Sequence, residues 1–192
     1  NADVIPDRIE AGTFLMAGAL LGKITLNNVN PGHLDTVLQK LGEVGAQLET
    51  TSNSITIKPG DLKPIDMKTA VYPGFATDLQ AQWVALMSLA DGSSMVTDTV
   101  YHDRFSHVPE LNRFGANIKV DKNTAFIRGV KELVGAPVMS TDIRASAALI
   151  IAALAAKGQT EVSRVYHIDR GYERIEEKFR NLGAEISRAN FQ

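Results

Sequence analysis

The sequence contains no cysteine among its 192 residues, which excludes disulfides, thiolate metal sites and a cysteine nucleophile. It also lacks a long apolar run. The most apolar stretch, ASAALIIAALAA at 145–156, is far shorter than the roughly 20 residues that a membrane-spanning helix needs. No basic segment followed by an apolar one indicates a signal peptide at the N-terminus. These absences favour a cytoplasmic protein with no membrane segment.

An excess of one charge sign is missing as well. Lys and Arg total 20, Asp and Glu total 22, and the formal net charge is −2, whereas a nucleic-acid-binding protein usually carries a basic face. The four histidines have no metal-ligand spacing such as H-E-x-x-H, and no P-loop, G-x-G-x-x-G or G-x-S-x-G motif occurs. We therefore expect no metal, no cofactor and no nucleic-acid partner. The 44% hydrophobic content predicts a globular domain.

What the sequence does contain is a threefold internal repeat. Three markers recur in the same order: an aspartate that opens an apolar helix, a glycine before a strand, and a Gly-Ala pair that follows a second helix. The markers are Asp7, Asp78 and Asp142; Gly22, Gly92 and Gly158; and the pairs that begin at Gly45, Gly115 and Gly183. Successive copies lie 64 to 71 residues apart. A period of this size predicts one supersecondary unit per repeat.

Each unit is predicted to run helix, strand, helix, strand, strand. The first helix of each unit is apolar almost all round, as expected for a helix covered on several sides. We therefore predict one α/β domain over residues 1–192, in which units of about 1–74, 75–138 and 139–192 surround a pseudo-threefold axis with helices inside and sheets outside. The third unit is expected to be incomplete. No return strand follows AEISRAN, so a strand from elsewhere in the natural protein should complete it.

Two arginines occupy equivalent places in the second and third repeats. Arg104 ends VYHDR and Arg170 ends VYHIDR, each between a predicted strand and a helix N-terminus, where guanidinium groups and the helix dipole favour an anion. Alternatively, each arginine pairs with its neighbouring aspartate, Asp103 or Asp169, and only fixes the loop. Arg144, in the first turn of its helix, is either a solvated cation or a ligand clamp.

The three aspartates that open helices predict N-caps. Asp78 differs, because Thr77 and Gln80 could form a capping box around it. Thr77 would then cap the helix, and the Asp78 carboxylate would be free to accept a proton or to bind a hydroxyl. These patterns alone indicate an anion-binding cleft and no particular reaction.

Five collinear stretches resemble one enzyme family. VIPDRIEAGTF, YPGFATDLQAQ, DRFSHVPEL, TDIRASAALI and YHIDRGYERIEEK are similar to the C-terminal half of UDP-N-acetylglucosamine enolpyruvyl transferases. The resemblance implies an inside-out α/β barrel-like domain of three βαβαββ units, which faces a second domain across the active site. It also implies transfer of enolpyruvyl from phosphoenolpyruvate to the 3′-hydroxyl of UDP-N-acetylglucosamine, the first committed step of peptidoglycan synthesis and hence of cell-wall growth and division.

The resemblance assigns roles to six residues. Asp78 matches the family's aspartate at the sugar 3′-hydroxyl, which serves as the base; Val100, with Tyr101 beside it, matches the strand end that contacts the nucleotide sugar. Basic residues around the reaction centre match Arg104, Arg144 and Arg170, with Arg170 nearest phosphoenolpyruvate. The family's mobile-loop cysteine, its Lys-Asn pair and a loop arginine have no counterpart in this chain. We therefore expect the chain to be inactive without the N-terminal domain. The alternatives are a related shikimate-phosphate enolpyruvyl transferase and a non-catalytic anion-binding scaffold.

Overall fold

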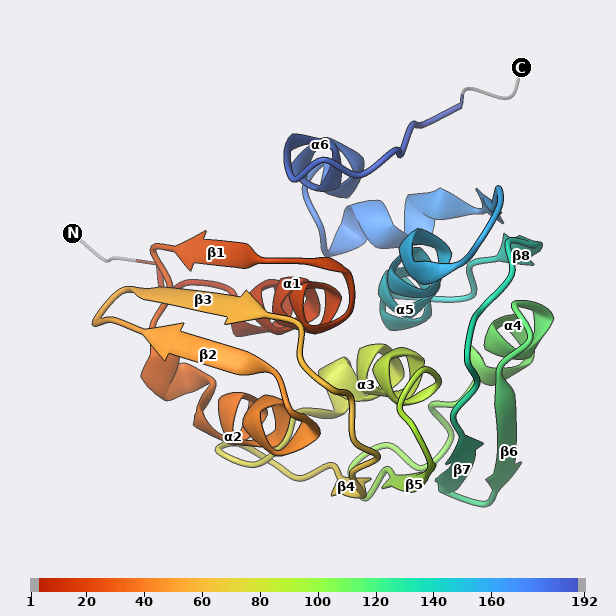
Figure 1. Cartoon of the computed structure of the whole chain (residues 1–192), viewed down its shortest axis with the longest axis horizontal. Coiled ribbons are helices and arrows are strands. Elements are labelled where there is room, and N and C mark those ends of the chain that lie inside the picture. Colours follow the sequence, from red (N-terminus) through yellow and green to blue (C-terminus); the bar gives the residue numbers. More distant parts are fainter. Residues whose placement is uncertain (1–3, 190–192) are drawn as a thin grey trace.

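The computed structural model describes residues 4–189, and three apolar helices meet at its centre (Figure 1). They are α1 (Arg8–Leu21), α3 (Gln80–Met87) and α5 (Ile143–Ala155). Each contacts the other two, and every residue of α3 is buried. The prediction of central helices that are apolar all round is confirmed, since a helix enclosed on all sides has no face left for polar residues.

Three separate sheets lie around these helices. The first has the antiparallel order β1 (Ile24–Asn27), β3 (Ser54–Lys58), β2 (Gln47–Thr50). The second has the order β4 (Met67–Lys68), β5 (Ser93–Thr97), β7 (Thr124–Arg128), β6 (Asn117–Asp121), with β4 parallel to β5. The third pairs β8 (Pro137–Met139) in parallel with β9 (Glu161–Ser163). The fold is α/β as predicted, but no closed barrel forms among residues 4–189.

The remaining helices lie nearer the surface. The α-helices are α2 (Asp35–Val44), α4 (Val108–Arg113) and α6 (Ile175–Asn181). The 3-10 helices are η1 (Pro31–His33), η2 (Thr77–Leu79) and η3 (Val165–Arg170). No helix in the described part of the chain has the length and apolarity needed to cross a membrane.

The repeat markers take up equivalent conformations. The glycines that end α2, α4 and α6 all have positive φ, 109° at Gly45, 89° at Gly115 and 96° at Gly183. The second helices therefore all end at a glycine in the left-handed region, as is common at helix C-termini. Two hairpins also form, between β2 and β3 and between β6 and β7.

Two features differ from the sequence prediction. The short strands β4 and β8, which precede α3 and α5, are missing from the element order predicted from the repeat, although the βαβαββ order implied by the resemblance includes them. β4 joins the sheet of the second unit and β8 that of the third. In addition, residues 184–189 form no strand and extend away from α6 (Figure 1). The corresponding β6 pairs with β7, whereas the described residues provide no such partner for 184–189. A strand needs a hydrogen-bonded neighbour.

Candidate functional site

The three aspartates that open the central helices do not behave alike. The carboxylate of Asp7 accepts hydrogen bonds from two backbone N–H groups at the start of α1, and that of Asp142 does the same at the start of α5. Both are N-caps, as predicted. Asp78 lies instead within η2, ahead of α3, and its side chain caps no helix.

The predicted capping box around Asp78 is wrong. The Thr77 hydroxyl donates to Oδ2 of Asp98, at 2.6 Å, and makes no cap. Both amide atoms of Gln80 are buried without a hydrogen-bond partner in the described structure. Asp78 nevertheless caps no helix: it lies within the 3-10 turn through which the chain enters α3, and no backbone N–H among residues 4–189 donates to its carboxylate.

Close packing sets the position of this turn. A Cβ atom built on Gly12 of α1 would lie 2.6 Å from a methyl carbon of Leu79. Glycine therefore lets η2 approach α1 more closely than any other residue would allow. Leu79 is only 1% exposed, so the residue next to Asp78 is firmly held.

Two arginines from distant elements converge on Asp78. Nη1 of Arg104 lies 2.7 Å from Oδ1 of Asp78, and Nε of Arg144 lies 3.3 Å from the same oxygen. The side chains are 36% exposed for Asp78, 25% for Arg104 and 21% for Arg144, so a ligand can reach all three. The group carries one more positive than negative charge, and Oδ2 of Asp78 has no partner among residues 4–189. This arrangement suits an anion with a hydroxyl beside it.

The alternative in which each arginine pairs with its neighbouring aspartate is wrong for both loops. Arg104 bonds Asp78. Asp169 instead accepts two hydrogen bonds from Arg188, at 2.8 and 2.7 Å. The Arg188 hydrogen bond holds the pKa of Asp169 below its usual value, against a smaller opposing effect of burial. Neither loop arginine therefore fixes its loop by pairing with the neighbouring aspartate.

Arg170 is not drawn into this cluster. It is exposed at the end of η3 and has no hydrogen bond or ion pair within the described residues. Its neighbour Gly171 lies beside the cluster, however: a Cβ on Gly171 would be 3.7 Å from Nη1 of Arg144. The backbone at Arg170 thus borders the site, while its side chain has no bonding partner among the described residues.

Val100 and Tyr101 form the other border. The guanidinium carbon of Arg104 lies 5.0 Å from the centre of the Tyr101 ring, within cation–π range. The side chains of both residues are exposed. The structure therefore brings Tyr101, Arg104, Asp78 and Arg144 together, with Val100 adjoining through the backbone.

A buried polar cluster beneath Arg144 was not predicted. The hydroxyls of Thr13 and Tyr172 are 2.7 Å apart, and the Gln82 amide nitrogen donates to both, at 3.0 and 3.3 Å. Burial raises the pKa of Tyr172, opposed by the Thr13 hydrogen bond and by the Arg144 guanidinium. The available signal was the presence of polar residues in two otherwise apolar buried helices: Thr13 in α1, and Gln82 together with Gln80 in α3.

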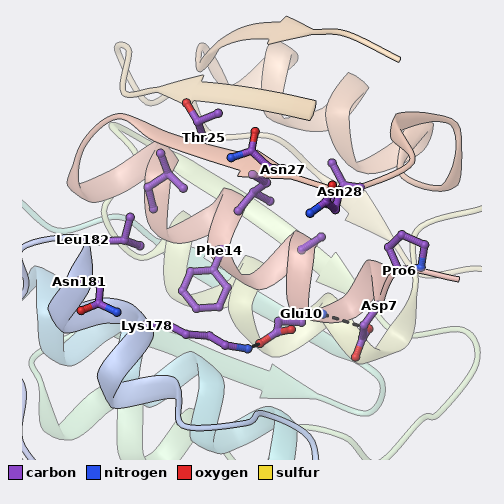
Figure 2. A pocket seen from close by; sticks show the side chains of 14 residues that line it. Pro6, Asp7, Glu10, Phe14, Thr25, Asn27, Asn28, Lys178, Asn181 and Leu182 are labelled. Atoms are coloured by element: carbon purple, nitrogen blue, oxygen red, sulfur yellow. Dashed lines mark hydrogen bonds and ion pairs between the residues drawn. The ribbon is translucent and has the colours of Figure 1, made fainter. Parts of the chain in front are cut away.

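A cavity lies elsewhere, between α1, β1 and α6 (Figure 2). It measures about 520 Å³, and an ion pair of 2.5 Å between Lys178 and Glu10 crosses its wall. None of the six predicted site residues lines it. We place the candidate site at Asp78 because the reactive charges gather there. Among residues 4–189, no group of three or more acidic or histidine side chains is arranged to hold a metal.

Comparison with known proteins identifies the relatives of this chain. Residues 1–179 match the family model of EPSP synthase (3-phosphoshikimate 1-carboxyvinyltransferase). The UDP-N-acetylglucosamine 1-carboxyvinyltransferases of Chlorobium chlorochromatii and Campylobacter lari are 57% and 54% identical to the chain, over 97% and 96% of its length. The chain spans only 44% and 45% of these two relatives, so it corresponds to less than half of their length.

Solved structures agree with this relationship. The enolpyruvyl transferase NikO of Streptomyces tendae superposes with a TM-score of 0.87 at 29% identity, over 97% of this chain and 45% of that one. EPSP synthase of Acinetobacter baumannii shares the fold, with a TM-score of 0.64 at 19% identity over 84% of this chain and 39% of its own. The chain belongs to the EPSP synthase (3-phosphoshikimate 1-carboxyvinyltransferase) family, and the curated relatives it resembles are UDP-N-acetylglucosamine 1-carboxyvinyltransferases.

Proposed function

We propose that this chain supplies one side of the active site of a UDP-N-acetylglucosamine enolpyruvyl transferase and corresponds to its C-terminal half. The observation that carries the proposal is Asp78, a carboxylate that caps no helix and is partly exposed between two arginines. The names of the relatives identify the reaction, and the cluster has the charges that this reaction requires.

In this proposal Oδ2 of Asp78 accepts the proton of the sugar 3′-hydroxyl while the hydroxyl oxygen attacks C2 of phosphoenolpyruvate. A proton from the other side of the site is added at C3, giving a tetrahedral intermediate that keeps its phosphate. Loss of inorganic phosphate and of one C3 proton then leaves the enolpyruvyl ether. Holding both substrates in one cleft favours such a step because it removes the entropy cost of their encounter.

The arginines bind the anionic groups of the substrates. Arg104 and Arg144 present guanidinium N–H groups that suit carboxylate or phosphate oxygens, and the exposed Arg170 adds a third cation nearest phosphoenolpyruvate. Val100 and Tyr101 contact the nucleotide sugar from the loop that follows β5. When a substrate anion takes up donors of Arg104 or Arg144, the contacts that now hold Asp78 are released for catalysis.

The proposal also assigns an occupant to the large cavity. In the third sheet β8 lies between α4 and β9, where the Glu110 carboxylate of α4 accepts the Met139 N–H at 2.8 Å. Lys178 of α6 stands, like Glu110, five residues before the glycine of its Gly-Ala pair, and it faces β1 across the cavity (Figure 2). The place that β8 fills in the third unit is thus a cavity in the first.

We propose that a strand parallel to β1 occupies this cavity, supplied by the part of the protein that the relatives have and this chain does not span. In the second and third sheets the paired strand puts a buried apolar residue opposite Val96 and Val162. Val96 and Val162 each lie four residues after the marker glycine of their unit, as Leu26 does in the first unit. The strand should therefore place an apolar residue opposite Leu26. Amides on the free edge of β1 should exchange faster in residues 1–192 than in the longer protein.

The domain description follows the same logic. We propose one domain over residues 1–192 whose three units, about 1–74, 75–138 and 139–192, are related by a pseudo-threefold axis along the central helices. The pairings of β4 with β5 and of β8 with β9 move the two unit boundaries toward the N-terminus, ahead of β4 and β8. The strand proposed beside β1 completes the first unit, and another strand from outside the chain completes the third, so that each unit has the βαβαββ order.

The cellular role follows from the reaction. We propose that the complete enzyme acts in the cytoplasm, where phosphoenolpyruvate and UDP-N-acetylglucosamine are made. It would catalyse the first committed step of peptidoglycan synthesis and so support cell shape and division. It would need no cofactor, since the reaction is an addition followed by an elimination.

Phosphate release tests this function. A protein of the relatives' length should release phosphate from phosphoenolpyruvate only when UDP-N-acetylglucosamine is present, and residues 1–192 alone should release none. The family model bears the name of the 3-phosphoshikimate enzyme, so shikimate 3-phosphate is the competing acceptor. Turnover with shikimate 3-phosphate in place of the nucleotide sugar would overturn our assignment, and turnover with neither would favour a scaffold role.

A further inference from the structure

We infer that Asp98 is a positioning residue, which holds the Arg104–Asp78 pair and the Val100–Tyr101 backbone in one arrangement. The inference rests on the function proposed above and extends it to a residue that touches no substrate. Asp98 immediately follows β5 and is fully buried, with 0% of its surface exposed.

The Asp98 carboxylate collects four donors from three segments. Oδ1 accepts the Thr69 hydroxyl at 2.7 Å and the N–H groups of Val100 and Tyr101 at 3.0 and 2.8 Å. Oδ2 accepts the Thr77 hydroxyl at 2.6 Å. A single buried side chain thus ties the residue after β4, the turn before α3 and the loop after β5.

Two of these bonds lead to Arg104 by independent routes. Thr77, held by Asp98, lies 3.4 Å from Nη1 of Arg104, the atom that bonds Asp78. The backbone of Tyr101, also held by Asp98, sets the ring that lies against the Arg104 guanidinium. Thr77 thus restrains Nη1 of Arg104, and the Tyr101 ring restrains the plane of its guanidinium group. Loss of Asp98 therefore releases Arg104 from two restraints at once.

The backbone of Asp98 is also held by hydrogen bonds, so the main chain that carries the carboxylate is fixed in position. Its N–H donates to the Asn123 carbonyl at 2.8 Å, and the Asn123 side-chain amide donates to its carbonyl at 3.0 Å. Asn123 lies in the turn between β6 and β7. The second sheet therefore serves as the rigid frame on which the carboxylate orders the loop, as a preorganised site requires.

The charge of Asp98 suits this task. Burial acts to raise its pKa, but the hydrogen bonds from Thr77, Tyr101, Thr69 and Val100 outweigh burial and hold it below the usual value. An ionised carboxylate accepts hydrogen bonds about twice as strong as those of a neutral group. Asn at this position keeps one acceptor oxygen for the three donors now at Oδ1. Ala keeps none, so the two substitutions should differ in severity.

The inference is tested first on residues 1–192, without any assay of turnover. Hydrogen exchange measured by NMR should show the amides of Val100 and Tyr101 exchanging at least tenfold faster in Asp98→Ala than in the wild type, with Asp98→Asn between them. Asp66→Asn is the matched control, because Asp66 is an exposed carboxylate that accepts the Met95 N–H of β5 at 2.7 Å. It should leave both amides unchanged. Unchanged exchange in a folded Asp98→Ala protein overturns the inference.

The second arm measures turnover in the protein of the relatives' length. Asp98→Ala should raise KM for UDP-N-acetylglucosamine about tenfold and lower kcat, Asp98→Asn should recover part of both, and Asp66→Asn should match the wild type. If Asp98→Ala does not fold, Asp98→Asn and Thr77→Val decide, since each weakens one set of bonds. Wild-type kinetics in these variants overturns the inference. A wild-type protein inactive on UDP-N-acetylglucosamine overturns the proposed function instead, and the exchange experiment still decides whether Asp98 orders the loop.

Discussion

The carboxylate of Asp78 lies 2.7 Å from Nη1 of Arg104, a residue 26 positions away in the sequence. Arg144, 66 positions away, reaches the same oxygen atom. The three residues come from η2, the loop after β5 and the first turn of α5. Each is therefore placed by a different element, and their meeting depends on how the central helices pack.

In the function proposed above Asp78 is the general base. Asp78→Asn should therefore lower kcat by about 10²- to 10⁴-fold in the protein of the relatives' length, because loss of such a group typically costs that much. The amide keeps the size of the side chain and can still accept a hydrogen bond from Arg104, so KM should change much less. Phosphate release measures both constants. Asp121→Asn, at the exposed end of β6, is the control. A kcat of Asp78→Asn within threefold of the wild type would remove Asp78 from the mechanism.

Arg104→Lys should raise KM for the anionic substrates by about 10- to 100-fold, because hydrogen bonds to charged groups are worth about 1.5–3 kcal/mol. Lysine keeps the positive charge but loses the planar fork that reaches Asp78 and lies on the Tyr101 ring. Steady-state kinetics on folded protein measures the effect. Arg128→Lys, exposed at the end of β7, should leave KM unchanged. Equal KM values for Arg104→Lys and the wild type would mean that charge alone suffices.

The sequence predicted the repeat because its markers are local. A glycine that ends a helix in the left-handed conformation and an aspartate that caps one act within a few residues. Gly45 and Asp142 therefore behaved as expected. The strands β4 and β8 were missed because they contain only two and three residues, and β8 begins with Pro137. Their pairing is set by tertiary contacts that local patterns do not encode.

The site was predicted only in part, for a related reason. Asp78, Arg104 and Arg144 were singled out by motif and resemblance, but the residue that binds Arg104 was open until the structure paired it with Asp78. Asp98 was missed altogether. It follows a strand in TDTV with no local motif, and its four donors come from positions between 69 and 101. A buried acceptor is recognised from the donors around it, and the sequence alone does not show which donors surround Asp98.

Gly12→Ala should lower the free energy of unfolding by about 1–3 kcal/mol, because overpacking a filled core costs that much. The new methyl group would lie 2.6 Å from a carbon of Leu79, a side chain that is only 1% exposed. Gly42→Ala in α2 is the matched control. A Cβ there meets nothing within 4 Å, so alanine should stabilise the helix by about 0.5–1 kcal/mol. Urea unfolding of residues 1–192 measures both. Equal stabilisation by the two variants would contradict the close contact between α1 and η2.

Acid should destabilise the chain through His107, which is 1% exposed and whose Nε2 has no partner among the described residues. Burial lowers the pKa of His107 to about 4, and the nearby Asp142 opposes this shift only partly. The unfolded chain, with a histidine pKa of 6.5, binds more protons between pH 4 and 6.5. The contribution of His107 to the free energy of unfolding is therefore fully present above pH 6.5. The free energy of unfolding falls by about 3 kcal/mol as the pH drops to 4. Asp98 and Asp142, whose pKa values are lowered from 3.8, add their loss mainly below this range. Urea unfolding of the wild type and of His107→Leu at pH 7 and pH 5 tests this, and an equal loss of stability in both proteins would show that His107 is not responsible.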